Sequence, residues 1–140
     1  MMTRLARGDS LALGALMMVL AGCGTTTGPD PVIMTGSWGG DHAVLDVTAT
    51  SASIEFDCAH GTLDHPLRVD ERGRFSVAGT FVPEHGGPVH PGEVPESQPA
   101  RYQGRLDRQK LEFTVTVEGK TGQGPFTVTL AKAPKLTKCL

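Results

Sequence analysis

Apolar residues recur at every second position over most of the chain after Gly36, and this pattern is the strongest constraint on its fold. A period of two is typical of β-strands that bury one face, and no stretch there shows the 3.6-residue period of a long amphipathic helix. The clearest runs are His42–Thr48, Ser53–Cys58, Phe75–Phe81, Arg101–Leu106, Leu111–Val117 and Phe126–Leu130. A weaker run, Leu63–Val69, contains Pro66 and reads as an edge or bulged strand, and Lys135–Leu140 is a candidate eighth strand.

Short polar segments separate these runs and are typical of hairpin connections. Examples are Asp70–Gly73, Asp107–Gln109 and Glu118–Gly124. Seven or eight consecutive antiparallel strands with one apolar face close into an up-and-down barrel or fold into a two-sheet sandwich. Because the hairpins are short and sequential, and because closure removes exposed edges, we expect an all-β domain at 36–140, most simply a closed or nearly closed β-barrel.

The first 22 residues have the order of parts found in a secretory signal peptide. Two arginines precede the apolar run Leu11–Leu20, which is too short to cross a hydrocarbon core of about 30 Å as a helix. The run ends in Leu20-Ala21-Gly22-Cys23, which resembles the lipobox of bacterial lipoproteins. That resemblance implies cleavage before Cys23, lipidation of its thiol and stable anchoring by several acyl chains. An ordinary signal peptide and a buried apolar helix are the alternatives.

Residues 23–35 are rich in Gly, Thr and Pro without apolar periodicity, and they predict a flexible tether behind the anchor. Gly24 would follow the lipidated cysteine, whereas the familiar inner-membrane retention signal of Gram-negative lipoproteins is an Asp at that place. The resemblance therefore implies a cell-envelope protein, sorted to the outer membrane if the host is Gram-negative.

Cys58 and Cys139 remain after Cys23 is assigned to the lipid. Export would place them in an oxidising compartment, where two thiols in a small domain usually pair. The disulfide would close a loop of 139 − 58 + 1 = 82 residues, for which the chain-entropy model gives about 4.5 kcal/mol. It would also bring the ends of the folded chain together. Two free buried thiols are the alternative.

The charge of the chain excludes some partners. The net charge is −2, and removal of a leader that carries Arg4, Arg7 and Asp9 leaves −2 − 1 = −3. Such a balance argues against a nucleic-acid partner, and it offers no electrostatic reason to lie on an anionic membrane. Nucleophile-elbow, zincin, P-loop and Rossmann motifs do not occur, so we expect neither an enzyme nor a cofactor, although carboxylate pairs for glycoside hydrolysis can lie far apart along a chain.

Gly36-Ser37-Trp38 resembles the G-x-W that opens lipocalin and avidin-type barrels. The alternative is that Trp38 simply plugs one end of the core. A ligand carrier would need a cavity among the large aromatic residues, which can equally fill an eight-stranded barrel. Those residues are Trp38, Phe56, Phe75, Phe81, Phe113 and Phe126. Separately, Ile54–Gly61 and Lys138–Leu140 resemble a family of small bacterial envelope β-domains of uncharacterised function, which implies the domain and no activity.

Pro83–Pro99 is a long loop of seventeen residues with five prolines. Loops of this length are usually functional or disordered, and proline lowers the entropy cost of holding one shape. We expect it to be a binding loop, through Pro83, Glu84, His85, Pro88, His90 and Glu93. The alternative function is divalent metal binding, because imidazole and carboxylate groups suit zinc or copper. Its ligands would be Glu84, His85, His90 and Glu93, whose spacing matches no compact zinc motif.

His60 lies near Cys58 in a stretch that would suit a Cys–His nucleophile only if the thiol were free. Since we expect a disulfide there, we interpret His60 and Gly61 as a turn whose imidazole bonds local backbone. The sequence thus predicts a lipid-anchored, non-enzymatic envelope protein that offers its loop to an envelope protein or a small ligand. A spacer or surface coat is the structural alternative.

Overall fold

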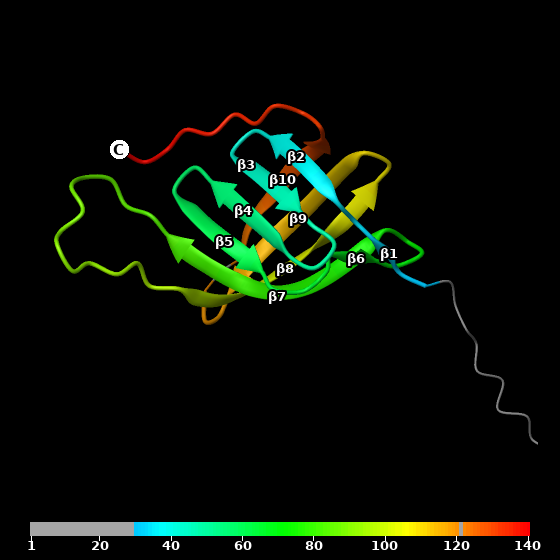
Figure 1. The fold of residues 1–140 in the computed structure, drawn as a ribbon, viewed down its shortest axis with the longest axis horizontal. Helices are drawn as coiled ribbons and strands as arrows, with labels where there is room; N and C mark the ends of the chain where they lie inside the picture. Colours follow the sequence, from blue (N-terminus) through cyan, green and yellow to red (C-terminus); the bar gives the residue numbers. More distant parts are fainter. Residues whose placement is uncertain (1–29, 121) are drawn as a thin grey trace, which may run out of the picture.

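The computed structural model describes residues 30–120 and 122–140. The expected signal peptide, Cys23 and most of the expected tether lie outside these residues. Eight strands close a barrel in the order β10-β2-β3-β4-β5-β7-β8-β9, and β1 and β6 form a separate two-stranded sheet (Figure 1). The all-β barrel expected from the alternating pattern is therefore confirmed. Within the described ranges, no helix is long and apolar enough to span a membrane.

The barrel is an antiparallel meander in which each strand pairs with the next barrel strand along the chain. β10 closes it by pairing with both β9 and β2. The strands are β2 (Gly36–Gly40), β3 (Ala43–Val47), β4 (Ala52–Phe56), β5 (Ala59–Leu63), β7 (Arg74–Pro83), β8 (Gln98–Asp107), β9 (Lys110–Val117) and β10 (Gln123–Leu130). Burial alternates residue by residue along β9, as the period of two requires.

The expected strand Ser53–Cys58 is shorter than the pattern indicates. It ends at Phe56, which pairs with Ala59, so Asp57 and Cys58 form the turn of a tight hairpin that leads into β5. Asp57 is a common turn residue, but Cys58 is not the Gly that usually follows it, and the alternating sequence pattern runs through the turn without a break.

Two further expected strands are absent from the barrel. Leu63 ends β5, and only Arg68–Val69 of the expected strand Leu63–Val69 is extended again, as β6 outside the barrel. Lys135–Leu140 forms no strand beyond a single bridge between Lys135 and Asp41. The place in the barrel that the tail was expected to take belongs instead to β2, the segment that holds the G-x-W.

The folded part of the chain begins before Gly36. Val32–Ile33 is β1, and it pairs with β6 in antiparallel register. Met34 is buried, and its N–H donates to the carbonyl of Leu67 at 2.9 Å. Three residues that we expected in the tether thus belong to the fold, because β1 pairs with β6 and Met34 buries apolar surface against the segment that follows β5.

Aromatic side chains fill much of the barrel interior. The ring centroid of Phe56 lies 4.7 Å from that of Phe126, 5.8 Å from Phe81 and 6.4 Å from Phe113. Trp38 is 4% exposed, and no group accepts a hydrogen bond from its indole Nε1 within the described chain. Tyr102 is also buried, and its hydroxyl donates to the carbonyl of Thr80 at 2.7 Å.

The two ends of the barrel carry different parts of the chain (Figure 1). At the end that we call the base lie β1, β6 and the β8–β9 turn at Arg108–Gln109. At the opposite end, which we call the loop end, lie the Asp57–Cys58 turn and the loop between β7 and β8. Residues 131–140, the C-terminal strap, run from β10 along β2 to the loop end. The expectation that the ends of the folded chain meet is therefore wrong.

Candidate functional site

The long loop at the loop end spans 84–97, since β7 continues through Pro83 and β8 already begins at Gln98. The His85 ring braces it from within. Its Nε2 pairs with the Glu93 carboxylate, and its Nδ1 lies 3.1 Å from the carbonyl oxygen of Gly86. The other Glu93 oxygen accepts the backbone N–H of His90 at 3.1 Å. These bonds join the two sides of the loop across eight residues.

The brace is electrostatic as well as geometric. A carbonyl oxygen only accepts hydrogen bonds, so the imidazolium form of His85, with a proton on each nitrogen, satisfies both of its partners. The Gly86 carbonyl, followed by Glu93, raises the pKa of His85 above its usual range. The His90 N–H, followed by His85, lowers the pKa of Glu93. Both shifts favour the charged pair.

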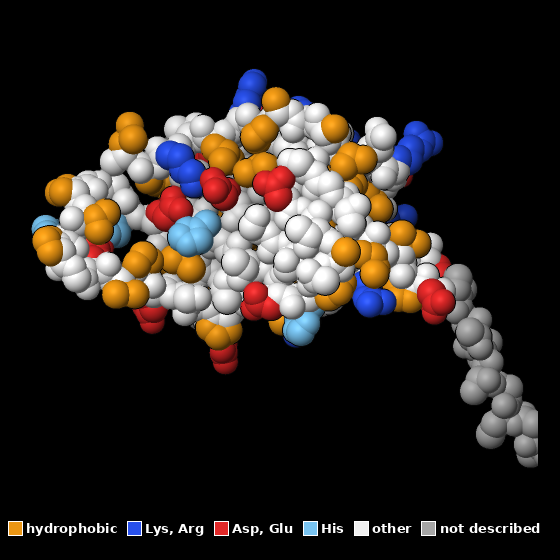
Figure 2. All heavy atoms as spheres, viewed as in Figure 1, with side chains coloured by type: hydrophobic (Ala, Val, Ile, Leu, Met, Phe, Trp, Pro, Cys, Tyr) orange, Lys and Arg blue, Asp and Glu red, His pale blue; other side chains and the backbone are white. Residues whose placement is uncertain are grey.

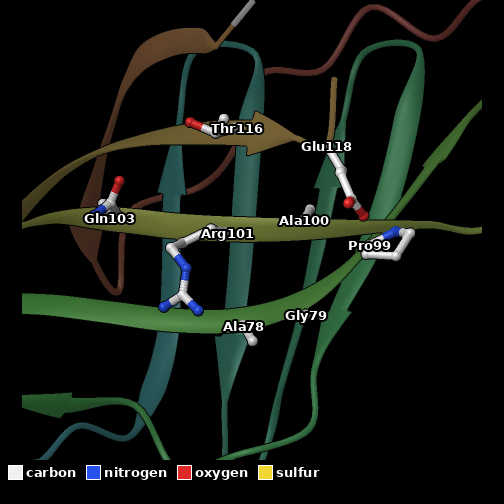
Figure 3. Close-up of a pocket in the computed structure, with 8 residues that line it drawn as sticks. All are labelled: Ala78, Gly79, Pro99, Ala100, Arg101, Gln103, Thr116 and Glu118. Carbon is white, nitrogen blue, oxygen red and sulfur yellow. The ribbon is translucent and has the colours of Figure 1, made fainter. Parts of the chain in front are cut away.

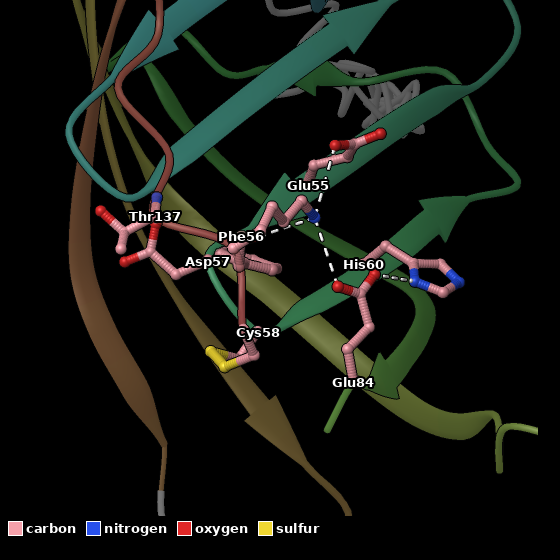
Figure 4. Close-up of polar contacts among 9 residues, drawn as sticks. Glu55, Phe56, Asp57, Cys58, His60, Glu84 and Thr137 are labelled. Atoms are coloured by element: carbon pink, nitrogen blue, oxygen red, sulfur yellow. Dashed lines mark hydrogen bonds and ion pairs between the residues drawn. A yellow bond between two sulfur atoms is a disulfide. The ribbon is translucent and has the colours of Figure 1, made fainter. Parts of the chain in front are cut away.

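Glu84 is the first residue of the loop, which we call its root, and it holds the loop to the barrel. Its backbone N–H donates to the carbonyl of Cys58 at 2.9 Å, and its carboxylate lies 2.8 Å from His60 Nδ1 and 3.3 Å from Lys138 Nζ (Figure 4). The hydrogen bond from His60, aided by Lys138, lowers the pKa of Glu84. Our interpretation of His60 as a turn residue is wrong. It lies in β5, and its imidazole contacts the carboxylate of Glu84, the residue that directly follows the neighbouring strand β7.

The strap fastens onto the same place. Cys139 forms the expected disulfide with Cys58, with the two Cα atoms 5.3 Å apart. The backbone N–H of Thr137 donates to Asp57 Oδ1 at 2.7 Å, and Lys138 Nζ donates to the carbonyl of Phe56 at 3.1 Å (Figure 4). The Asp57–Cys58 turn is therefore held by backbone, side-chain and covalent contacts at once.

The C-terminal residue also packs against the loop. A side chain at Gly86 would collide with the backbone carbonyl of Leu140, so only glycine permits this approach. The strap thus contacts both the hairpin turn and the first residues of the loop.

A third histidine–carboxylate pair, His42 with Asp57, also lies at this end. His42 Nδ1 lies 2.5 Å from Asp57 Oδ2, and the His42 backbone has a φ of 71°, a conformation that residues other than glycine rarely adopt. The Thr137 N–H, followed by His42 among the lowering contacts, lowers the pKa of Asp57. Sequence reasoning missed this pair, since fifteen residues separate its members and no motif joins them.

The expected metal ligands do not converge. Glu84 faces His60 and Lys138, His85 and Glu93 pair with each other, and His90 contributes a backbone N–H to Glu93. Among residues 30–120 and 122–140, no three His, Cys, Asp or Glu side chains lie close enough to hold an ion together.

Two surface hollows lie near the loop. One, of about 280 Å³, opens at the loop end above Phe56, Phe81 and Phe126, and His42 and Asp57 line its rim. The other, of about 470 Å³, is a shallow hollow on the outer wall across β7, β8 and β9, beside Arg101 and Glu118 (Figure 3). Ala78 and Gly79 also line it. Neither hollow brings together an arrangement that suggests a reaction.

The described residues thus form a closed β-barrel with a braced, C-terminally strapped loop at one end. In comparisons with known proteins, no family model matches the chain, and no curated protein or solved structure shows a significant match.

Proposed function

We propose that this chain is a lipid-anchored cell-envelope protein that binds a partner, without catalysis, through the loop at 84–97. The observation that carries the proposal is the placement of the loop. It projects from the end opposite to the base, where the N-terminal segment joins the barrel (Figure 1). A protein anchored at Cys23 would therefore hold the loop away from its membrane.

The construction of the loop supports a binding role. The His85–Glu93 brace and the Glu84 contacts reduce the entropy that a binding loop would lose on meeting a partner. The loop nonetheless leaves two aliphatic side chains in solvent, with Val89 74% and Val94 84% exposed. Exposed apolar side chains on a rigid projection are suited to insertion into a pocket of another protein.

Site-specific photo-crosslinking in the native envelope tests the proposal. A benzophenone amino acid at Val94 should give a discrete adduct with one envelope or exported protein. The matched control is the same amino acid at Thr114, an exposed position on the outer wall of β9. Breaking the brace with Glu93→Gln should lower the adduct yield at position 94 while the barrel keeps its melting temperature.

Equal adduct patterns at positions 94 and 114 would contradict loop-mediated binding. The anchor has its own test, the mass of the N-terminal peptide of the mature protein. We expect that peptide to begin at Cys23 and to carry acyl groups, and Cys23→Ala should release the protein from the membrane. An unprocessed chain with a bare Cys23 would refute the lipoprotein assignment.

A further inference from the structure

The base of the barrel exposes an apolar pair close to the expected anchor. Val32 is 66% exposed and Ile33 is 40% exposed, although both lie in β1 and are paired with β6. Figure 2 shows hydrophobic side chains at the two extremes of the molecule, on the loop and around the point where the grey N-terminal trace meets the barrel. The apolar pair at the base is therefore remote from the loop.

The length of the connecting chain keeps the base near the membrane. Seven residues, Gly24–Asp30, separate Cys23 from Pro31. Fully extended, the eight steps from Cys23 to Pro31 span at most roughly 29 Å, at about 3.3–3.6 Å for each residue. If Cys23 is acylated, the base can never lie farther than this from the lipid surface, and β1 is the first folded element that the lipids meet.

Arginines gather at the same end. Apart from Arg101, every arginine of the described chain lies at the base, in β6, in the turns that follow β6 and β8, or in the adjoining strand ends. They are Arg68, Arg72, Arg74, Arg105 and Arg108. Arg74 is paired with Asp70 at 3.0 Å. Arg68 and Arg72 have no ion-pair partner within the described ranges, and Arg72 lines a hollow of about 380 Å³ beside Pro31.

The two ends differ in charge. The cations at the base are matched by carboxylates, so the net charge there is close to zero. Besides the five arginines, the base carries Lys110 and the carboxylates Asp30, Asp46, Asp64, Asp70, Glu71, Asp107 and Glu112. The loop and its root carry Glu84, Glu93 and Glu96 without an arginine, and the nearby cations are lysines such as Lys138, which Glu84 already engages. A negatively charged membrane surface would therefore repel the loop end more than the base.

We propose that the base is a membrane-contact surface that rests on phospholipid headgroups. Val32 and Ile33 enter the headgroup region, and Arg68 and Arg72 bind lipid phosphates. Arginine suits this role because its planar guanidinium donates two parallel hydrogen bonds to phosphate oxygens. The contact sets the barrel upright, with the loop directed away from the lipid. This inference rests on the proposed anchor at Cys23, and it adds an interaction that acylation alone does not require.

The test uses the full mature chain with its lipids, reconstituted into vesicles of phosphatidylcholine alone or of equal parts phosphatidylcholine and phosphatidylglycerol. A benzophenone amino acid at Val32 should capture phospholipid, identified by the mass of the adduct. The same amino acid at Thr114 is the control, and we expect it to capture at least fivefold less. Capture at Val32 should occur on both kinds of vesicle, since both carry lipid phosphates.

Arg68→Gln with Arg72→Gln should lower the ratio of docked to undocked protein roughly fivefold for each arginine. Arg101→Gln, on the outer wall, is the matched control and should leave capture unchanged. Equal lipid capture at positions 32 and 114, capture of a protein at position 32, or indifference to the two arginines would each overturn the inference. The same sample reports the anchor separately: acylated Cys23 without capture at Val32 refutes the contact surface alone, whereas bare Cys23 refutes the proposed function on which it rests.

Discussion

Nζ of Lys138 lies 3.3 Å from Oε2 of Glu84, so a side chain of the C-terminal strap holds the first residue of the long loop. The same ammonium group donates to the carbonyl of Phe56 and lies 3.5 Å from Glu55. The strap is thus a structural support for the loop as well as the end of the chain, and this relationship leads to our first two predictions.

Lys138→Met keeps the length of the side chain and removes its charge. Because the pair with Glu84 is partly solvent-exposed, we expect a loss of about 0.2–1 kcal/mol in the stability of the loop root. Amide hydrogen exchange at 85–97 should quicken by up to about fivefold, and exchange in β9 should stay unchanged. Lys132→Met is the control, because Lys132 lies in the strap without contacting Glu84. Equal exchange in the two variants would show that Lys138 does not support the loop.

Cys58→Ala with Cys139→Ala should lower the free energy of unfolding by about 2–5 kcal/mol, since the disulfide constrains a long loop in the unfolded chain. Guanidinium chloride unfolding, followed by the single Trp, measures the change. Reduction of the parent protein by a dithiol reagent should give a similar loss. If the double variant unfolded at the same denaturant concentration as the parent, the strap would contribute no stability through this bond.

The stability of the His85–Glu93 brace should be greatest within a pH range that has an upper limit set by His85 and a lower limit set by Glu93. Its raised pKa means that His85 contributes stability fully below the ordinary histidine value of 6.5, and this is lost as pH rises through the folded pKa. The lowered pKa of Glu93 contributes stability above the ordinary value of 4.5, which is lost as pH falls through the folded pKa. The loop should therefore be most ordered between these two values. Loop backbone amide shifts measured by NMR against pH test this, and Glu93→Gln should flatten the profile.

The single tyrosine should not ionise in the folded protein at ordinary alkaline pH. Burial raises the pKa of Tyr102 well above its usual range. In an alkaline titration, phenolate absorbance should therefore appear together with unfolding and not before it. Unfolding is monitored separately by far-ultraviolet circular dichroism. Phenolate absorbance near pH 10 in a chain that is still folded would show that Tyr102 is accessible to solvent.

Zinc or copper should not bind tightly to the loop, because the side chains of Glu84, His85 and Glu93 face other partners. Isothermal titration of the protein should show no micromolar binding. Micromolar binding that disappears in His85→Ala with His90→Ala would instead support the metal hypothesis and would require the loop to rearrange.

Much of the barrel was predictable because burial of one face imposes a period of two wherever a strand lies. The runs around Leu45, Val77 and Phe113 all became barrel strands with their apolar faces inward. The errors fell where this signal is weak. Asp57 and Cys58 form a turn that lacks a glycine, and β2 is a glycine-rich strand whose apolar pattern rests on Trp38.

The candidate site was only partly predictable for a different reason. Composition and length pointed to the loop, and the pairing of Cys58 with Cys139 followed from the count of cysteines and the compartment we expected. The contacts of Glu84 with His60 and of Asp57 with His42 join residues on different strands. Nothing in the local sequence specifies which side chains meet across a barrel.

By itself, the sequence determined the class of fold, because alternation of apolar and polar residues leaves a chain few ways to bury its surface other than a one-sided sheet. It also determined which two described cysteines pair. Only the tertiary structure decided that the base and the loop lie at opposite ends and that the strap supports the loop. Those arrangements depend on how the barrel closes and on the path of residues 131–140, which are set by long-range contacts and not by the local pattern.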